Sequence, residues 1–93
     1  MIKSFSDKDT EQLYVAGKSA KFPMAVCKIG ARKLDYLNGA AKLSDMKAPP
    51  GNRLEALKDK YEGKHSIRIN TQYRIVFKWA EGDAYDVEIT DYH

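Results

Sequence analysis

The sequence lacks several features that would assign it to a class at once. Its 93 residues include one cysteine, Cys27, so the chain cannot form an internal disulfide. No apolar run approaches the roughly 18 residues of a membrane span. The start, MIKSFSDKDTEQ, is polar and has no apolar signal core. These absences predict a cytoplasmic protein with no membrane partner, and the length predicts a single domain over residues 1–93.

Common catalytic and cofactor motifs are also missing. The chain has no glycine-rich phosphate loop and no Ser/His/Asp signature. Its two histidines, His65 and His93, have no partner at metal-ligand spacing. We therefore expect neither a metal nor a cofactor, and we interpret His65 as a partly buried structural residue.

Charge is unevenly distributed along the chain. The net charge is +3, with a pI near 9.0, which permits a nucleic-acid partner without requiring one. Residues 53–78 contain seven basic and three acidic side chains, whereas residues 79–93 contain five acidic and no basic ones. Solvated strand edges decorated with lysine would explain the same pattern.

Two helices are expected in the first half of the chain. Ser6 is a typical helix N-cap, and this helix would end near Gly17–Lys18. Pro23 can open a second helix, because its missing N–H costs nothing in the first turn. Cys27 borders the apolar stripe of that helix, which predicts a small, partly buried residue. The stripe itself recurs at helical spacing: Val26, Ile29, Leu34, Leu37 and Ala41.

After the breaker Pro49–Gly51 the apolar period changes to about two. Strands are predicted within residues 53–57, 64–70, 73–79 and 84–92, with MIKSF as a short edge strand. The order predicts an α+β fold in which two N-terminal helices pack on one face of an antiparallel β-sheet.

Alternation assigns the side chains to two faces. Ile67 and Ile69 share one face, and a loop at Thr71–Tyr73 would set Ile69 opposite Ile75. Arg68 and Arg74 then share the open face. In the last strand we expect Tyr85, Val87 and Ile89 to face the core, and the chain end to return towards the 70–73 turn.

These residue types suit chemistry on a phosphate. Guanidinium groups match phosphate oxygens, tyrosine can stack on a base, and histidine can move a proton near neutral pH. Arg68, Arg74, Lys58, Tyr92 and His93 therefore indicate a ribonuclease, in which a 2′-OH attacks the adjacent phosphorus. Solvated arginines and an idle terminal histidine remain the alternative, so the residues alone do not separate an enzyme from a binding domain.

The sequence resembles the HigB-type toxins of the RelE superfamily. The resemblance lies in PPGNRLEALKDKYEGKHSIRINTQYRIVFKW and the closing DAYDVEITDYH. It implies a small RelE-like fold and a bacterial toxin that enters the ribosomal A site and cuts translated messenger RNA without a metal. It also implies an antitoxin of the helix-turn-helix type, like HigA, that neutralises the toxin. The toxin would bind DNA only as part of the toxin–antitoxin complex.

The resemblance carries over to particular positions. It implies that Lys58, Arg68, Arg74, Asp91, Tyr92 and His93 form the catalytic site and that Asn70 helps to bind substrate. His93 would act as general base or acid, with Lys58 as its partner or as an electrostatic stabiliser. Helix-borne cations, including Lys28, Arg32 and Lys33, would add salt-sensitive attraction to ribosomal RNA.

Two positions depart from the family pattern. Glu55 stands where many members have a histidine, and Asp59 where many have a glycine. Glu55 is expected either to serve as an alternative base or to lower the local positive charge. The rival interpretation is therefore a weak or inactive toxin that mainly binds the ribosome or co-represses transcription with its antitoxin.

Overall fold

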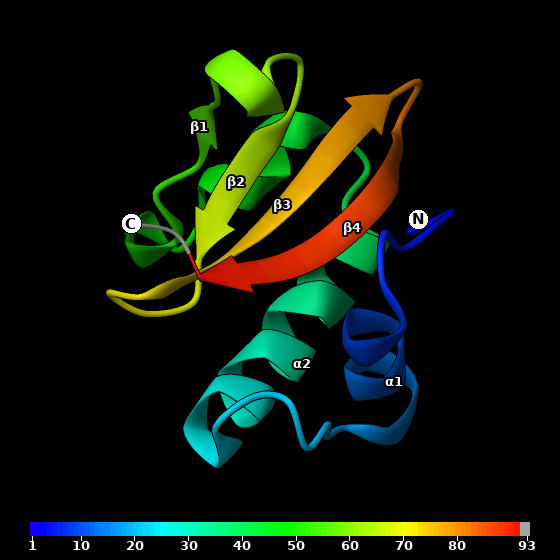
Figure 1. Cartoon of the computed structure of the whole chain (residues 1–93). Helices are drawn as coiled ribbons and strands as arrows, with labels where there is room; N and C mark the ends of the chain where they lie inside the picture. The colour runs from blue at the N-terminus through cyan, green and yellow to red at the C-terminus, as the bar shows by residue number, and fades with distance from the viewer. Residues whose placement is uncertain (92–93) are drawn as a thin grey trace.

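The computed structural model describes residues 1–91. Two helices, α1 (Lys8–Ala16) and α2 (Met24–Gly39), precede a four-stranded antiparallel sheet of order β1-β2-β3-β4 (Figure 1). Short 3-10 helices, η1, η2 and η3, lie between α2 and β2 and cover Leu43–Lys47, Pro50–Asn52 and Asp59–Tyr61. The strands are β1 (Glu55–Ala56), β2 (His65–Arg68), β3 (Tyr73–Ala80) and β4 (Asp83–Asp91). The predicted α+β class is confirmed.

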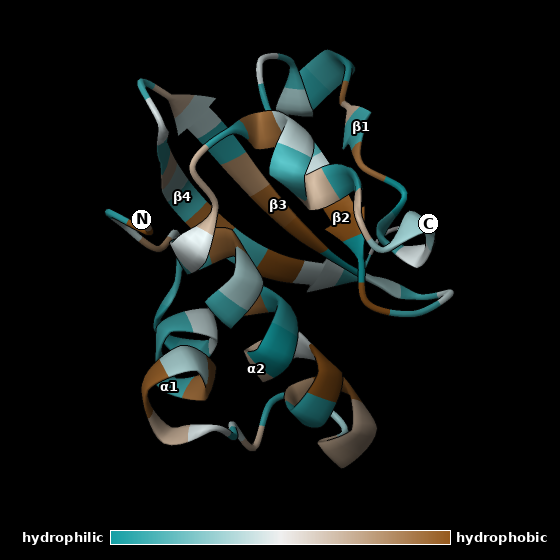
Figure 2. Ribbon diagram, turned by 180° about the vertical axis from the view of Figure 1, so that it is seen from behind, coloured by the Kyte–Doolittle hydropathy of each residue, from teal (hydrophilic) through white to brown (hydrophobic). Residues whose placement is uncertain are grey.

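The core lies between the helices and one face of the sheet. Leu13 of α1 and Leu34 of α2 are fully buried in the same cluster as Ile75 and Phe77 of β3. Figure 2 views the molecule from this side, where apolar stretches of β2 and β3 face the helices. Within residues 1–91, no helix has both the length and the apolar character needed to cross a membrane.

The first helix begins one residue later than the sequence predicts. Asp7 is its N-cap, and the Ser6 hydroxyl instead donates to the carbonyl of Asp86 on β4 at 2.9 Å. The predicted end is confirmed, because Gly17 has a φ of 81°, the left-handed conformation that glycine adopts freely. Ser6, which the local pattern assigns to the helix as its N-cap, therefore hydrogen-bonds to the sheet instead.

The second helix has the predicted apolar stripe over most of its length. Val26, Leu34 and Leu37 are buried, and Cys27 is 4% exposed, as expected for a small core residue. The helix ends at Gly39, however, so Ala40 rather than Ala41 is buried against the core.

The N-terminal segment lies along the outer edge of β4. Ile2 and Phe5 form parallel bridges with Ala84 and Val87. The N–H of Lys3 donates to the Ala84 carbonyl at 2.8 Å. The predicted position at a sheet edge is confirmed, but the segment forms two isolated bridges and not the predicted strand.

The β2–β3 register differs from the prediction by two residues. Ile67, not Ile69, lies opposite Ile75. The reason is the turn: the side-chain carbonyl of Asn70 accepts the backbone N–H of Gln72 at 2.8 Å and of Tyr73 at 2.7 Å. Such an Asx turn starts the reversal earlier. Because the shift is even, every side chain keeps its predicted face.

A β-bulge in β4 overturns one core assignment. Val76 pairs with Glu88 but Lys78 pairs with Tyr85, so β4 contains one extra residue between these pairs. Asp86 within it has a φ of 52°. The bulge inverts the alternation, which turns Tyr85 to the open face and puts Ala84 in the core.

Candidate functional site

The two predicted arginines lie directly opposite each other on the open face. Arg68 ends β2, and its Cα partner on β3 is Arg74. Like charges directly opposite across an antiparallel pair destabilise a sheet. The pairing therefore places two positively charged residues side by side at the end of β2.

Arg74 is held by two side chains that lie two residues along the sheet, on the same face. Its Nη1 lies 2.8 Å from Glu55 Oε1 and donates to the Ser66 hydroxyl at 2.9 Å. Glu55 and Ser66 are themselves Cα partners across β1 and β2. The side chain of Arg74 is 14% exposed and that of Glu55 is 47% exposed, so the carboxylate is the accessible member of the pair.

Arg68 differs from Arg74 in its contacts. Its Nε is buried and has no hydrogen-bond partner within residues 1–91. Its backbone carbonyl accepts a hydrogen bond from Nζ of Lys33 on α2. A buried donor without a partner is uncommon in folded proteins, and it distinguishes Arg68 from Arg74.

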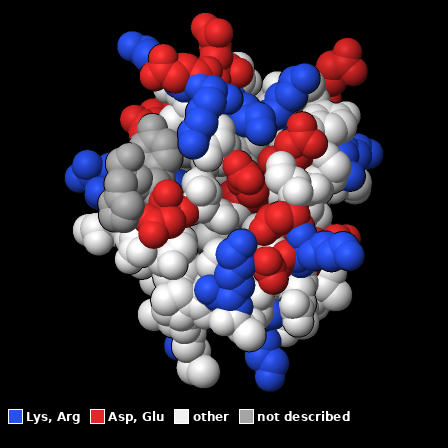
Figure 3. Space-filling view, viewed as in Figure 1, with Lys and Arg blue, Asp and Glu red and all other residues white. Residues whose placement is uncertain are grey.

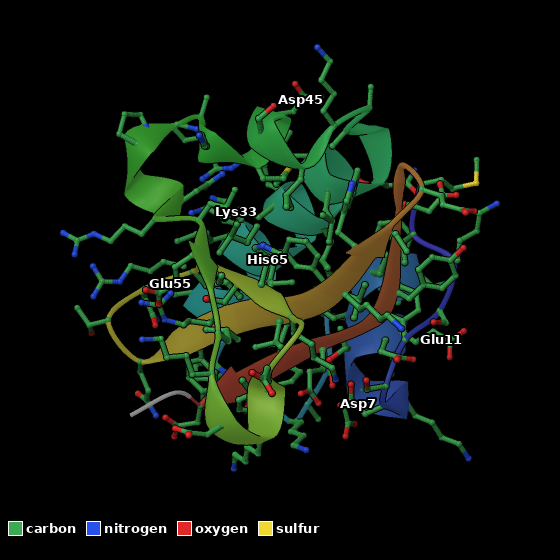
Figure 4. The ribbon with its side chains drawn as sticks, turned by 90° about the horizontal axis from the view of Figure 1, so that it is seen from above. Asp7, Glu11, Lys33, Asp45, Glu55 and His65 are labelled. Atoms are coloured by element: carbon green, nitrogen blue, oxygen red, sulfur yellow. The ribbon has the colours of Figure 1, made fainter. Side chains whose placement is uncertain are left out.

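Lys33 is not the surface cation that the sequence predicts. It is 9% exposed and faces the sheet (Figure 4), whereas Lys28 and Arg32 on the same helix are exposed. Burial lowers the pKa of the Lys33 ammonium from its usual 10.5, and the neighbouring Arg32 charge lowers this pKa further. Lys33 is therefore unavailable for direct attraction to RNA.

The other predicted site residues surround the arginine pair less closely. Lys58 is exposed, three residues beyond Glu55, and within residues 1–91 no hydrogen bond or ion pair joins it to either arginine. Asn70 uses its side-chain carbonyl in the turn, and Asp91 accepts a hydrogen bond from Gln72 Nε2 at 2.9 Å. Their roles at a substrate stay predictions.

The predicted return of the chain end is confirmed as far as Asp91. Thr90 and Asp91 are the Cα partners of Arg74 and Tyr73. Tyr92 and His93, which the sequence assigns to the same site, lie outside the described residues.

The open side of the sheet carries charges of both signs. Figure 3 shows Lys and Arg intermixed with Asp and Glu there, rather than a single basic field.

Beside β1, a shallow hollow of about 400 Å³ is lined in part by Lys47, Glu55 and His65. His65 also stacks on Phe77, with ring centroids 6.3 Å apart, which confirms its partly buried structural position. Within residues 1–91, no group of three or more His, Cys, Asp or Glu side chains could hold a metal ion.

Three contributors to this site escape sequence reasoning. Ser66 is fully buried and binds Arg74, Gln72 holds Asp91, and Lys33 holds the backbone of Arg68. Ser66 had a signal, because it lies two residues before Arg68 and so shares its face. Lys33 and Gln72 had none, since their partners are 35 and 19 residues away in the sequence.

Known proteins match this chain over nearly its whole length. The family model for the RelE-like toxin of type II toxin–antitoxin system HigB matches residues 3–93. Toxin HigB-1 of Vibrio cholerae is 41% identical over 85 residues, covering 90% of each chain. Endoribonuclease HigB of Proteus vulgaris is 31% identical, with 100% of both chains covered.

A solved structure supports the fold. The YoeB-YefM complex from Staphylococcus aureus contains a chain that matches with a TM-score of 0.62 at 16% identity, covering 100% of this chain and 98% of that one. This likeness bears on the fold alone, and the sequence matches carry the family assignment. The chain belongs to the HigB-like toxins, the RelE-like toxins of type II toxin–antitoxin systems.

Proposed function

We propose that this toxin is an endoribonuclease that cuts messenger RNA in the ribosomal A site and so arrests growth. The observation that carries the proposal is the Arg68–Arg74 rung, where two arginines lie directly opposite each other on the open face. One of them has a buried donor with no partner within residues 1–91. The name of the Proteus vulgaris relative, an endoribonuclease, supports the same activity.

The proposed reaction needs only the RNA and side chains of this chain. A base takes the proton of a ribose 2′-OH, and that oxygen attacks the adjacent phosphorus. The bond from phosphorus to the 5′ oxygen breaks, an acid protonates the departing oxygen, and a 2′,3′-cyclic phosphate remains. Arg68 and Arg74 bind the scissile phosphate and stabilise its extra negative charge in the transition state.

The remaining predicted residues supply proton transfer and positioning. His93 acts as base or acid, and Lys58 is its partner or an electrostatic stabiliser. Tyr92 stacks on a base or orients the attacking hydroxyl, Asp91 orients His93 or pairs with an arginine, and Asn70 contributes to substrate binding. In this scheme the reaction proceeds without a metal.

An antitoxin is the proposed protein partner. The matching Staphylococcus aureus structures are complexes of a toxin with its antitoxin, which supports a partner of that kind. We propose a HigA-like helix-turn-helix protein that neutralises the toxin in the cytoplasm and brings it to DNA only as a complex.

A second candidate function rests on the Glu55–Arg74 ion pair. A carboxylate 2.8 Å from the guanidinium competes with a phosphate for the same donors. A toxin in which this pair persists on the ribosome would bind and cut weakly. Its main effect would then be ribosome binding or co-repression with the antitoxin.

Induced expression with and without the antitoxin gene tests the two candidates. For the endoribonuclease we expect growth arrest that the antitoxin relieves, and new messenger 5′ ends confined to translated regions. Removal of the last two residues, Tyr92 and His93, should abolish the cuts while ribosome association persists. Intact messengers with the full-length chain would favour the binding function instead.

A further inference from the structure

Lys33 is the one ionisable side chain among the buried polar residues of the described chain. The others in that group are Thr10, Ser19, Asn52 and Ser66, which are all neutral. Removing an ammonium group from water is costly, and replacing such a group by an apolar residue of similar size is often neutral or stabilising. Stability alone therefore gives no reason for a lysine at this position.

The contact that Lys33 makes leads directly to the candidate site. Its Nζ donates to the backbone carbonyl of Arg68, across 35 residues of sequence. The lysine approaches from α2, on the helix side of the strands, while Glu55 lies on β1 (Figure 4) and contacts Arg74. One hydrogen bond thus joins the helical layer to the backbone of a predicted phosphate-binding residue.

Arg68 occupies a position where the strand needs such support. It is the last residue of β2, and its rung with Arg74 is the last before the turn. Beyond it, the N–H groups of Ile69 and Asn70 share one acceptor, the Tyr73 carbonyl, at 2.9 and 3.3 Å. Strand ends beside turns open locally more readily than strand centres, and the opposed arginines repel each other here.

We infer that Lys33 is a positioning residue for cleavage: it fixes the backbone of Arg68 from behind the sheet and so aims the guanidinium at the scissile phosphate. This inference rests on the proposed function of Arg68. Groups that bind a transition state must be held to within about 0.5 Å of the productive geometry, and supporting hydrogen bonds supply that accuracy.

The test compares Lys33→Met with a matched variant, Lys8→Met, which removes an exposed lysine from α1. Cleavage is measured in a single turnover on ribosomes that carry a defined messenger, at saturating ribosome concentration. We expect Lys33→Met to lower the cleavage rate about ten- to hundredfold, the effect of a small misplacement of a catalytic group. Ribosome affinity and the unfolding temperature should be maintained, and Lys8→Met should cut at the wild-type rate.

A double-mutant cycle separates positioning from a general structural effect. If Lys33 acts through Arg68, adding Lys33→Met to Arg68→Gln lowers the residual rate no further. Additive losses, or an unchanged rate in Lys33→Met alone, would overturn the inference.

Amide hydrogen exchange gives a readout that is independent of cleavage. We expect the amides of residues 68–73 to exchange faster in Lys33→Met than in Lys8→Met, at equal global stability. Equal exchange in the two variants would contradict the inference even if cleavage fell. If the wild-type chain cuts no messenger, the proposed function fails, while the exchange result still decides whether Lys33 holds this strand end.

Discussion

Nη1 of Arg74 lies 2.8 Å from Oε1 of Glu55, so the carboxylate that departs from the family pattern touches a predicted phosphate-binding guanidinium. The sequence left open whether Glu55 is a base or a counter-charge. The contact favours the counter-charge, because the carboxylate already lies in an ion pair with a guanidinium that is predicted to bind phosphate. An incoming phosphate would have to share Arg74 with Glu55 or displace it.

Replacing Glu55 should therefore strengthen binding to RNA. We expect Glu55→Gln to bind programmed ribosomes more tightly, with a salt dependence steeper by about one counterion, and to cleave at least as fast as wild type. Affinity as a function of salt and single-turnover cleavage measure this. Glu88→Gln is the matched control, since Glu88 shares the open face but pairs with Val76. A hundredfold loss of cleavage in Glu55→Gln would instead identify Glu55 as the base.

Removing one member of the arginine rung should separate activity from stability. We expect Arg68→Gln to lower the cleavage rate by about 10²–10³, as loss of a transition-state donor does. Its unfolding temperature should not fall, because the substitution relieves repulsion from the Arg74 charge directly opposite. Lys78→Gln, on the same face opposite Tyr85, serves as the control for loss of charge. Equal losses of cleavage in both variants would argue against a specific phosphate site.

The contact between α1 and the last strand should contribute to stability. The N–H of Ile89 donates to the hydroxyl of Thr10 at 2.9 Å in the buried core. Thr10→Val keeps the shape but leaves this donor unsatisfied, which should cost about 1–3 kcal/mol of unfolding free energy. Thr10→Ser keeps the hydroxyl and should lose less. Urea unfolding of the two variants measures the difference, and equal losses would assign the effect to packing.

Asp45 should make stability depend on pH in the acid range. Its carboxylate accepts the backbone N–H groups of Lys42 and Ala41 at 3.0 Å each, and these bonds, that of Lys42 first, lower its pKa from the usual 3.8. A lowered pKa in the folded state contributes stability above the unfolded value, and this contribution is lost as the pH falls through the folded value.

The matching experiment compares wild type and Asp45→Asn by thermal unfolding between pH 7 and pH 3. We expect the wild type to be the more stable at pH 7, and the difference to shrink below about pH 4. Asp35→Asn, which removes an exposed carboxylate of α2, controls for net charge. A difference that stays constant with pH would show that the charge of Asp45 is not its cause.

Local pattern predicted the fold well where one rule acted alone. The apolar stripe of α2, the glycine end of α1 and the shared face of Arg68 and Arg74 each follow from one periodicity or one backbone preference. The register error comes from the local turn at Asn70, and two other errors lie where a distant segment competes. Ser6 hydrogen-bonds to the Asp86 carbonyl on β4 instead of capping the helix. The bulge at Asp86 inverts the alternation of side chains that predicted Tyr85 in the core.

By itself, the sequence determined the class of the fold, the family and the face that carries the arginines, because these depend on period, composition and motif. Only the tertiary structure decided that Glu55 reaches Arg74 and that Lys33 is buried behind Arg68. Both contacts depend on how β1 and α2 pack against β2. That packing is set by the whole core, which joins residues from both helices and the sheet, so no local stretch of sequence encodes it.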